Sequence, residues 1–388
     1  MPQLETMLAM DKKPPFRVLS LDGGGMRGTY TATYLAQVTG SFAARRLVEG
    51  LDIGAAFNLI TGTSTGGIIA CALAAGIPLS EVVDLYRTHG PAIFPRKLPT
   101  TLVGIARDLS KRPAALKSGA KALAAALDEV LGSLTMAELY ANRKIALAIP
   151  AVEMSQHRSW VFKTPHLPGT NHRDDGYTLA DVCLATTAAP IYRSMAPLNH
   201  PNTINPGYNV FVDGGLWANN PVLVGLIDAL ELTEPGDRIE IFCLGTCPVP
   251  AGEQLRRDDV NRGLNGWKFG GEAASLAIDA QAFAFDNMAR MLARHVDRDC
   301  SVIRFPADKV PGALMPYLEL DDTSPEAAEA LINQARTDAD MTNSRCARSD
   351  DADARTICEL FSSAPVLSQP PVTRAPQSGV TTEGIPRV

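Results

Sequence analysis

Short apolar runs alternate with longer segments of helical periodicity along most of the chain. The first run, residues 16–21, follows two prolines and predicts a buried strand. The next segment predicts a helix, because its large apolar side chains recur at helical spacing: Tyr30, Tyr34, Leu35, Val38 and Phe42. A second apolar run, residues 57–60, precedes residues 68–75. That stretch is too uniformly apolar for a surface helix, so we expect it to be buried.

The same alternation continues toward the C-terminus. Further strands are predicted at 144–152, 159–163, 209–212, 239–245 and 301–305, with helices at 123–131, 179–188, 222–230 and 273–294. Strands that alternate with helices predict a largely parallel sheet covered on both faces. We expect one α/β domain over residues 16–362, with its motifs in 16–246 and a helical part in 247–362. Residues 1–15 form an N-terminal extension. Residues 363–388, rich in Pro, Ser, Thr and Gly, are predicted to be a flexible tail.

Composition excludes several classes of protein. Lys and Arg total 36 against 42 Asp and Glu, a net charge of −6, which argues against a DNA- or RNA-binding protein. The sequence has no run of about 18 apolar residues, so no transmembrane helix is predicted. Residues 1–15 lack a secretory signal, and seven scattered cysteines without zinc-ligand spacing favour reduced thiols in the cytoplasm and no metal site.

One basic stretch, residues 96–121, stands out from this acidic background. It has a single acid, Asp108, against seven cations: Arg96, Lys97, Arg107, Lys111, Arg112, Lys117 and Lys121. Apolar residues are interleaved with them: Leu102, Val103, Ile105, Ala106 and Leu109. The stretch is interpreted as a membrane-facing amphipathic cap or, more blandly, as a solvated helical face.

A glycine loop follows the first predicted strand, with the sequence Asp-Gly-Gly-Gly-Met-Arg-Gly at 22–28. Gly23, Gly25 and Gly28 match the dinucleotide-binding pattern, and Glu49 falls where such a site has an acid. However, Asp22 would repel a pyrophosphate, and this interpretation leaves two further loops unexplained. The loop offers a run of backbone N–H groups at a helix N-terminus, which can stabilise an anion, including one formed only in a transition state.

Two more loops carry candidate catalytic residues. Residues 62–66, Gly-Thr-Ser-Thr-Gly, lie between a strand and a buried helix, the context of a nucleophile elbow with Ser64 exposed and Gly62 and Gly66 avoiding clashes. An ordinary Gly/Ser turn is the alternative. Asp213, followed by Gly214 and Gly215, ends an apolar strand, where a carboxylate often only caps a turn.

Serine needs a base to remove its proton. None of the six histidines lies in a strand-to-turn context with glycine: His89, His157, His166, His172, His200 and His295. A Ser-His-Asp triad is therefore unsupported, and a Ser64–Asp213 dyad is the alternative. A free carboxylate with a pKa near 3.9 is a weak base, but burial at a strand end would raise that pKa.

In their order and contexts, the three motifs resemble those of the patatin-like phospholipase family. Residues 185–190, Ala-Thr-Thr-Ala-Ala-Pro, and 219–221, Asn-Asn-Pro, add to the resemblance, which covers about residues 16–246. It implies a three-layer α/β fold with a central, mostly parallel sheet flanked by helices, and it implies that 185–190 pack under the active site. Cys247 departs from the pattern, because many relatives carry glycine there.

The resemblance also implies roles for individual residues. Ser64 would be the nucleophile and Asp213 the base, with no metal or diffusible cofactor. The amides of Gly24 and Gly25, with Met26 as a further candidate, would form the oxyanion hole, and Arg27 matches the loop arginine of the family. The substrate would be a membrane phospholipid, reached by peripheral contact at the inner face of the membrane.

A narrower resemblance, carried by residues 26–30 and the added C-terminal helices, is to compact bacterial enzymes triggered by cyclic oligonucleotides in anti-phage defence. It assigns no nucleotide-binding residues and leaves the oligomeric state open, a homo-oligomer included. Two rival classes remain: a dinucleotide-dependent oxidoreductase using Gly23–Gly28, and an inactive patatin-like binding or storage protein.

Overall fold

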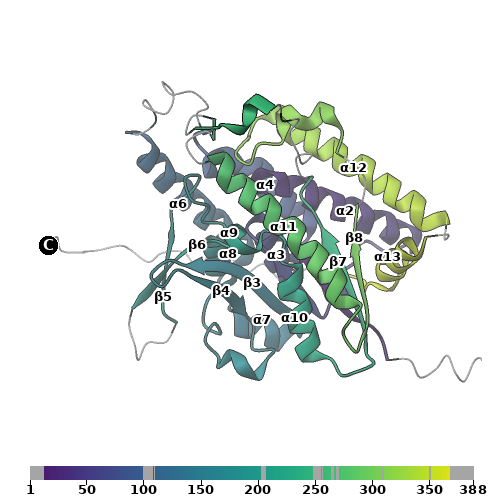
Figure 1. The fold of residues 1–388 in the computed structure, drawn as a ribbon. Coiled ribbons are helices and arrows are strands. Elements are labelled where there is room, and N and C mark those ends of the chain that lie inside the picture. The colour runs from purple at the N-terminus through teal and green to yellow at the C-terminus, as the bar shows by residue number, and fades with distance from the viewer. Residues whose placement is uncertain are drawn as a thin grey trace, which may run out of the picture.

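The computed structural model of the chain is shown in Figure 1. It describes residues 13–98, 108, 110–201, 207–247, 255, 257–263, 266–267, 271–306, 310–348 and 351–367. Most of the predicted N-terminal extension, most of the predicted tail and much of the basic stretch therefore lie outside the described residues.

A single sheet organises the described part of the chain. Its strands run in the order β5-β6-β3-β2-β1-β7-β8, and β4 pairs with β3 outside that path. The strands are β1 (Phe16–Leu21), β2 (Leu59–Gly62), β3 (Ala146–Glu153), β4 (Arg158–Lys163), β5 (Ala196–Asn199), β6 (Tyr208–Asp213), β7 (Arg238–Leu244) and β8 (Asp299–Arg304). Strands β3, β2, β1, β7 and β8 are parallel, whereas β4, β5 and β6 join antiparallel at one end. The predicted, mostly parallel sheet is confirmed.

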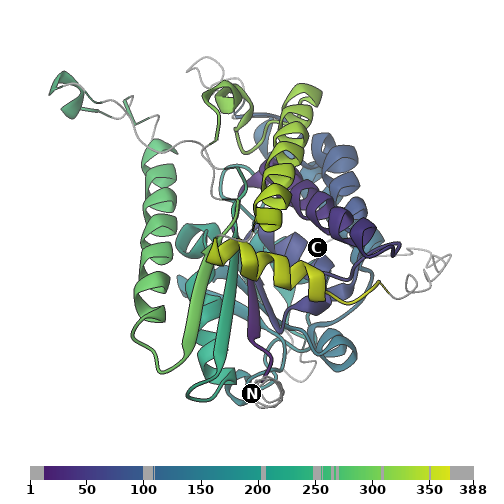
Figure 2. The ribbon, with the colours of Figure 1, turned by 90° about the vertical axis from the view of Figure 1, so that its right-hand side faces the viewer.

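Helices cover both faces of this sheet. They are α2 (Gly28–Arg45), α3 (Thr65–Ala75), α4 (Leu79–Ile93), α6 (Arg112–Leu131), α7 (Met136–Arg143), α8 (Leu179–Thr186), α9 (Gly215–Ala218), α10 (Val222–Leu232), α11 (Gly271–Ala293), α12 (Pro325–Arg348) and α13 (Ala352–Ser363). Figure 2 shows α11 on one side of the β7–β8 end of the sheet, and α2 and α12 on the other.

Strand alternation builds two apolar cores, one on each face. Val18 of β1 packs with residues of α10 and α11, whereas its neighbour Leu19 packs with residues of α2, α3 and α12. Successive side chains of a strand point to opposite faces, so a strand buried on both sides is apolar at nearly every position. This explains why the strands of the parallel part appear in the sequence as continuous apolar runs, and it confirms the three-layer α/β fold.

The C-terminal helices belong to the same core. Tyr30 and Tyr34 of α2 hydrogen-bond Asp338 and Thr342 of α12, at 2.5 and 2.7 Å. Beyond α13, residues 364–367 are held against the loop after α2: Asp52 N donates to Pro365 O at 2.8 Å, and Leu51 pairs with Val366. The rest of the predicted tail lies outside the described residues.

The sequence analysis missed β5 and shortened α6. Strand β5 has only four residues and contains Pro197, which removes a ladder donor and hides the strand from pattern analysis. Helix α6 begins at Arg112, eleven residues before the predicted start, because its first half exposes much of its surface and lacks a strong apolar stripe. Within the described residues, no helix is both long and apolar enough to cross a membrane.

Candidate active site

Ser64 occupies the sharp turn between β2 and α3. Its backbone has φ 54° and ψ −123°, a left-handed conformation that costs a residue with a side chain roughly 1–3 kcal/mol. The two flanking glycines are required by close backbone approach. A Cβ on Gly62 would lie 2.2 Å from Gly66 O, and one on Gly66 would lie 2.4 Å from Leu21 O. The predicted strand–turn–helix context of the nucleophile elbow is present.

The register of the sheet carries Asp213 to this turn. Strand β4 occupies one edge of β3 along residues 148–153, so β2 and β6 must share the other edge. Strand β2 pairs with residues 146–148 of β3, and β6 runs in the opposite direction along residues 151–153. The C-terminal ends of β2 and β6 therefore point toward each other. Figure 1 shows α3, α8 and α9 near the centre of the molecule.

Ser64 and Asp213 are in direct contact. Ser64 Oγ donates to Asp213 Oδ2 at 2.7 Å, and Gly215 N donates to Asp213 Oδ1 at 2.7 Å. Ser64 is 9% exposed and Asp213 6%. Burial raises the pKa of Asp213 to about 6, although the bonds from Ser64 and Gly215 and the charge of Arg193 oppose the rise. A carboxylate with this pKa is a far better base than a free aspartate.

The histidines do not approach this pair. Among the described residues, no histidine hydrogen-bonds Ser64 or Asp213. His166, the most buried one, lies 3.1 Å from Asp228 and 2.8 Å from Thr164 instead. The arrangement can therefore pass a proton from the serine hydroxyl to a carboxylate without an intervening imidazole.

Residues 185–190 lie beneath both members of the pair, as the resemblance implied. Thr186 Oγ1 accepts from Ser64 N at 2.9 Å and donates to Pro150 O at 2.6 Å. In the same segment, Ala188 O accepts from Asp213 N at 3.1 Å. One short loop thus fixes the backbone of the serine and of the aspartate.

The glycine loop lies against the nucleophile turn. A Cβ on Gly23 would lie 3.3 Å from Thr63 O, and one on Gly28 would lie 2.0 Å from Thr65 Oγ1. Gly25 has φ +56°, which favours glycine. Among the described residues, none accepts a hydrogen bond from Gly24 N or Gly25 N, so neither amide has a protein partner there.

Two other groups of this loop are already engaged. Met26 N donates to Leu320 O at 2.9 Å, so the expected Met26 contribution to an anion site is not available in this conformation. Arg27 Nε donates to Gly24 O at 3.3 Å, which ties the arginine to the loop, and burial lowers the Arg27 pKa.

Asp22 anchors the loop and does not face a ligand. Its carboxylate lies 2.7 Å from Arg304, whose Nε lies 2.9 Å from Asp286. Gly23 N donates to the main chain of Asn219 at 2.9 Å. Glu49 is exposed in the loop after α2 and does not end a strand. The dinucleotide-binding alternative is thus unsupported. Glu49 does not end a strand, where such a site needs its acid, and the amide of Gly23 is already bonded to Asn219 O.

Sequence analysis missed Arg193, which follows the loop under the dyad. The residue is 8% exposed, and burial lowers its pKa to about 10 while the charge of Asp213 acts in the opposite direction. No motif contains it, and a lone arginine after Pro-Ile-Tyr carries no sequence signal.

Ion pairs occupy part of the basic stretch. Arg96 and Arg112 both pair with Asp108, and Lys97 lies 2.6 Å from Glu319 and 2.9 Å from Asp322. The exposed cations of the stretch among the described residues include Lys111, Lys117 and Lys121. Arg107 and the interleaved apolar residues 102, 103, 105, 106 and 109 lie outside the described residues.

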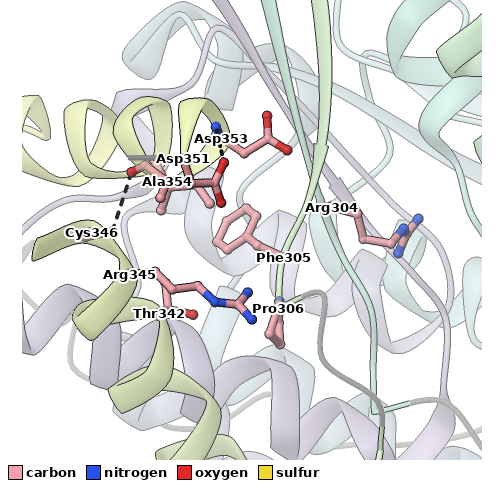
Figure 3. Close-up of a pocket in the computed structure, with 10 residues that line it drawn as sticks. Arg304, Phe305, Pro306, Thr342, Arg345, Cys346, Asp351, Asp353 and Ala354 are labelled. Carbon is pink, nitrogen blue, oxygen red and sulfur yellow. Dashed lines mark hydrogen bonds between the residues drawn. The ribbon is translucent and has the colours of Figure 1, made fainter. Parts of the chain in front are cut away.

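A small cavity lies apart from the dyad, between the end of β8, α12 and α13 (Figure 3). Its volume is about 60 Å³, and its lining includes Phe305, Arg345 and Asp351. Arg304 also borders it, but its guanidinium points away (Figure 3), consistent with its bond to Asp22. A space of this size suits a few water molecules, whereas small-molecule sites span roughly 300–1,000 Å³.

Comparison with known proteins relates the chain to one family. Residues 19–226 match the family model described as patatin-like phospholipase. A "cGAMP-activated phospholipase" of Pseudomonas aeruginosa is 35% identical over 281 residues, which cover 71% of this chain and 75% of that protein. Proteins with the same description from Vibrio cholerae and Escherichia coli are 35% and 36% identical, over 55% and 56% of this chain and 58% and 57% of theirs. The alignments with the latter two thus span under two thirds of those relatives. The chain belongs to the patatin-like phospholipase family.

Proposed function

We propose that the protein hydrolyses fatty-acyl esters of membrane phospholipids through a Ser64–Asp213 dyad. The observation that carries the proposal is the 2.7 Å hydrogen bond from Ser64 Oγ to the buried carboxylate of Asp213. A hydroxyl held on a strained turn and bonded to a base of raised pKa is the arrangement that nucleophilic acyl transfer requires.

The reaction proceeds in two acyl-transfer steps. Ser64 Oγ attacks the ester carbonyl carbon while Asp213 takes its proton, which gives a tetrahedral oxyanion. Collapse breaks the ester C–O bond, and the proton on Asp213 passes to the leaving lysolipid alkoxide. Water then attacks the acyl-serine, with Asp213 again accepting and returning a proton. In these steps the nucleophile and the base are groups of this chain, Ser64 and Asp213.

The amides of Gly24 and Gly25, which have no hydrogen-bond partner among the described residues, form the oxyanion hole in this scheme. Such donors act on charge that develops in the transition state, and each is worth roughly 3 kcal/mol. The bond from Arg27 to Gly24 O supports the loop in the conformation that presents these amides. Met26 has no donor role in the proposal, because its amide bonds Leu320 O.

A cyclic dinucleotide is the proposed activator, in a cytoplasmic enzyme of anti-phage defence that acts at the inner face of the membrane. The support comes from the three bacterial relatives that are described as cGAMP-activated phospholipases. The binding residues are unassigned. In its present form, the 60 Å³ cavity is too small for such a ligand.

Lipid hydrolysis by the full chain tests the proposal. Vesicles of phosphatidylglycerol and phosphatidylethanolamine are incubated with wild type or with Ser64→Ala, with and without cGAMP, and released fatty acid is measured. A fluorophosphonate probe should label wild type alone. Hydrolysis by Ser64→Ala at the wild-type rate would refute the dyad. Equal hydrolysis rates of wild type with and without cGAMP would refute the proposed activator.

A further inference from the structure

Arg193 is a buried cation without a carboxylate partner among the described residues. Its Nη1 is inaccessible to solvent and has no hydrogen-bond partner there. Two other arginines of low exposure have carboxylate partners. Arg17 lies 3.0 Å from Glu240. Arg304 pairs with two aspartates, although Arg304 Nη2 also lacks a hydrogen-bond partner among the described residues. Burying a charged donor without a partner is costly, so an orphaned guanidinium invites a functional explanation.

The position of Arg193 is set by the loop that supports the dyad. Its backbone N–H donates to Ala189 O at 2.9 Å, and the preceding carbonyl, that of Ala188, accepts from Asp213 N. The guanidinium lies over the ring of Phe94, 5.7 Å from its centroid. A single turn therefore places a cation and the proposed base beside each other, without a hydrogen bond between them.

An effect on Asp213 alone does not explain why Arg193 lies beside this proposed base. The positive charge of Arg193 lowers the pKa of Asp213, which opposes the effect of burial and weakens the base. An anion bound to Arg193 would screen that charge and restore basicity. The arrangement thus favours a substrate that brings its own negative charge to the guanidinium.

We propose that Arg193 binds the phosphodiester of the lipid substrate and thereby selects phosphate-bearing lipids over neutral acylglycerols. This inference rests on the proposed function. A guanidinium presents a planar fork of N–H donors that matches two phosphate oxygens, and burial strengthens each such bond. Ester, phosphate and oxyanion are then held by separate groups: Ser64, Arg193 and the glycine-loop amides.

Matched short-chain substrates test the assignment. Dihexanoyl phosphatidylglycerol and dihexanoylglycerol carry the same acyl esters and differ in the phosphate. Arg193→Met removes the charge, and Arg193→Lys keeps the charge but loses the fork. Arg87→Met is the matched control, since Arg87 is exposed and its one ion-pair partner in the described part of the chain is Asp84. All variants are assayed as full chains with cGAMP present.

The expected result is a change of selectivity. Arg193→Met should lower kcat/KM for the phospholipid by roughly 10- to 100-fold, the range of a lost charge-assisted hydrogen bond. Its kcat/KM for dihexanoylglycerol at pH 8 should be equal to or higher than that of wild type, because loss of the Arg193 charge strengthens Asp213 as a base. Arg193→Lys should lie between wild type and Arg193→Met on the phospholipid. An equal loss on both lipids, or no loss on either, would overturn the proposal.

A binding measurement separates this proposal from the catalytic one. Calorimetry of dihexanoyl phosphatidylglycerol with Ser64→Ala protein needs no turnover, and adding Arg193→Met should weaken the affinity at least tenfold, whereas adding Arg87→Met should not. Unchanged affinity refutes phosphate binding even if the dyad hydrolyses esters. Conversely, Arg193→Met could weaken the affinity although wild type hydrolyses no ester. That pair of results would support the Arg193 assignment and refute the hydrolase. Arg193→Lys provides the same comparison if Arg193→Met does not fold.

Discussion

Asp213→Asn should abolish hydrolysis and at the same time stabilise the protein in a pH-dependent way. Burial raises the pKa of Asp213 from its ordinary value of 3.8 to about 6, because the folded protein disfavours the charged form. Between these two values the folded state binds more protons than the unfolded state. The free energy of unfolding of wild type therefore contains a contribution that falls as pH rises through this window.

The magnitude follows from the two pKa values. At 1.36 kcal/mol per pKa unit, ionised Asp213 destabilises the wild-type fold by about 3 kcal/mol above pH 7. About 2 kcal/mol of this should develop between pH 4.5 and 8. Asparagine cannot ionise, so the variant lacks this loss. Weaker hydrogen bonds to Ser64 and Gly215 add a cost that is nearly constant with pH, and comparison across pH removes it.

Urea unfolding of both proteins at half-unit steps from pH 4.5 to 8 provides the measurement. The stability of Asp213→Asn relative to wild type should increase with pH, with most of the change below pH 7. Hydrolysis of a neutral soluble ester by wild type should rise with pH and level off above about pH 7, as the base ionises. A stability difference that stays flat over the whole range would refute the raised pKa and, with it, the physical basis of the dyad.

Three further predictions concern the dyad, the loop and the membrane. Ser64→Ala and Asp213→Ala should each cost at least about 100-fold in kcat/KM on a soluble ester, and the double variant should be little worse, because the two act as one unit; additive losses would contradict this. Gly24→Ala should lower kcat by about 100-fold, since the new Cβ would lie 2.2 Å from the Thr246 hydroxyl and displace the loop. Gly40→Ala, which meets no neighbour within 4 Å, should leave kcat unchanged, and a well-folded Gly24→Ala enzyme with wild-type kcat would move the oxyanion hole elsewhere. Three exposed cations of the basic stretch are replaced by serine: Lys111, Lys117 and Lys121. This change should weaken binding to anionic vesicles by about 3 kcal/mol at low salt, while soluble-ester hydrolysis stays constant. Equal co-sedimentation of both proteins would show that the stretch is only a solvated helical face.

Features encoded by neighbouring residues could be predicted from the sequence. The turn at Ser64 depends on glycines two positions away on either side, and the glycine loop depends on a strand and a helix that directly adjoin it. Strands buried on both faces need apolar residues at nearly every position, and these runs are visible without a structure. The fold class and the positions of Ser64 and Asp213 at strand ends follow from such local signals.

Tertiary structure alone decided which of these groups meet and which are already occupied. The contact between Ser64 and Asp213 depends on β2 and β6 sharing one edge of β3, a pairing between segments about 150 residues apart that no local periodicity encodes. The Met26 amide is taken by Leu320, nearly 300 residues later in the chain. The burial of Arg193 is likewise absent from the sequence pattern, because a side chain loses its solvent only when distant elements pack around it, and such packing depends on the whole fold.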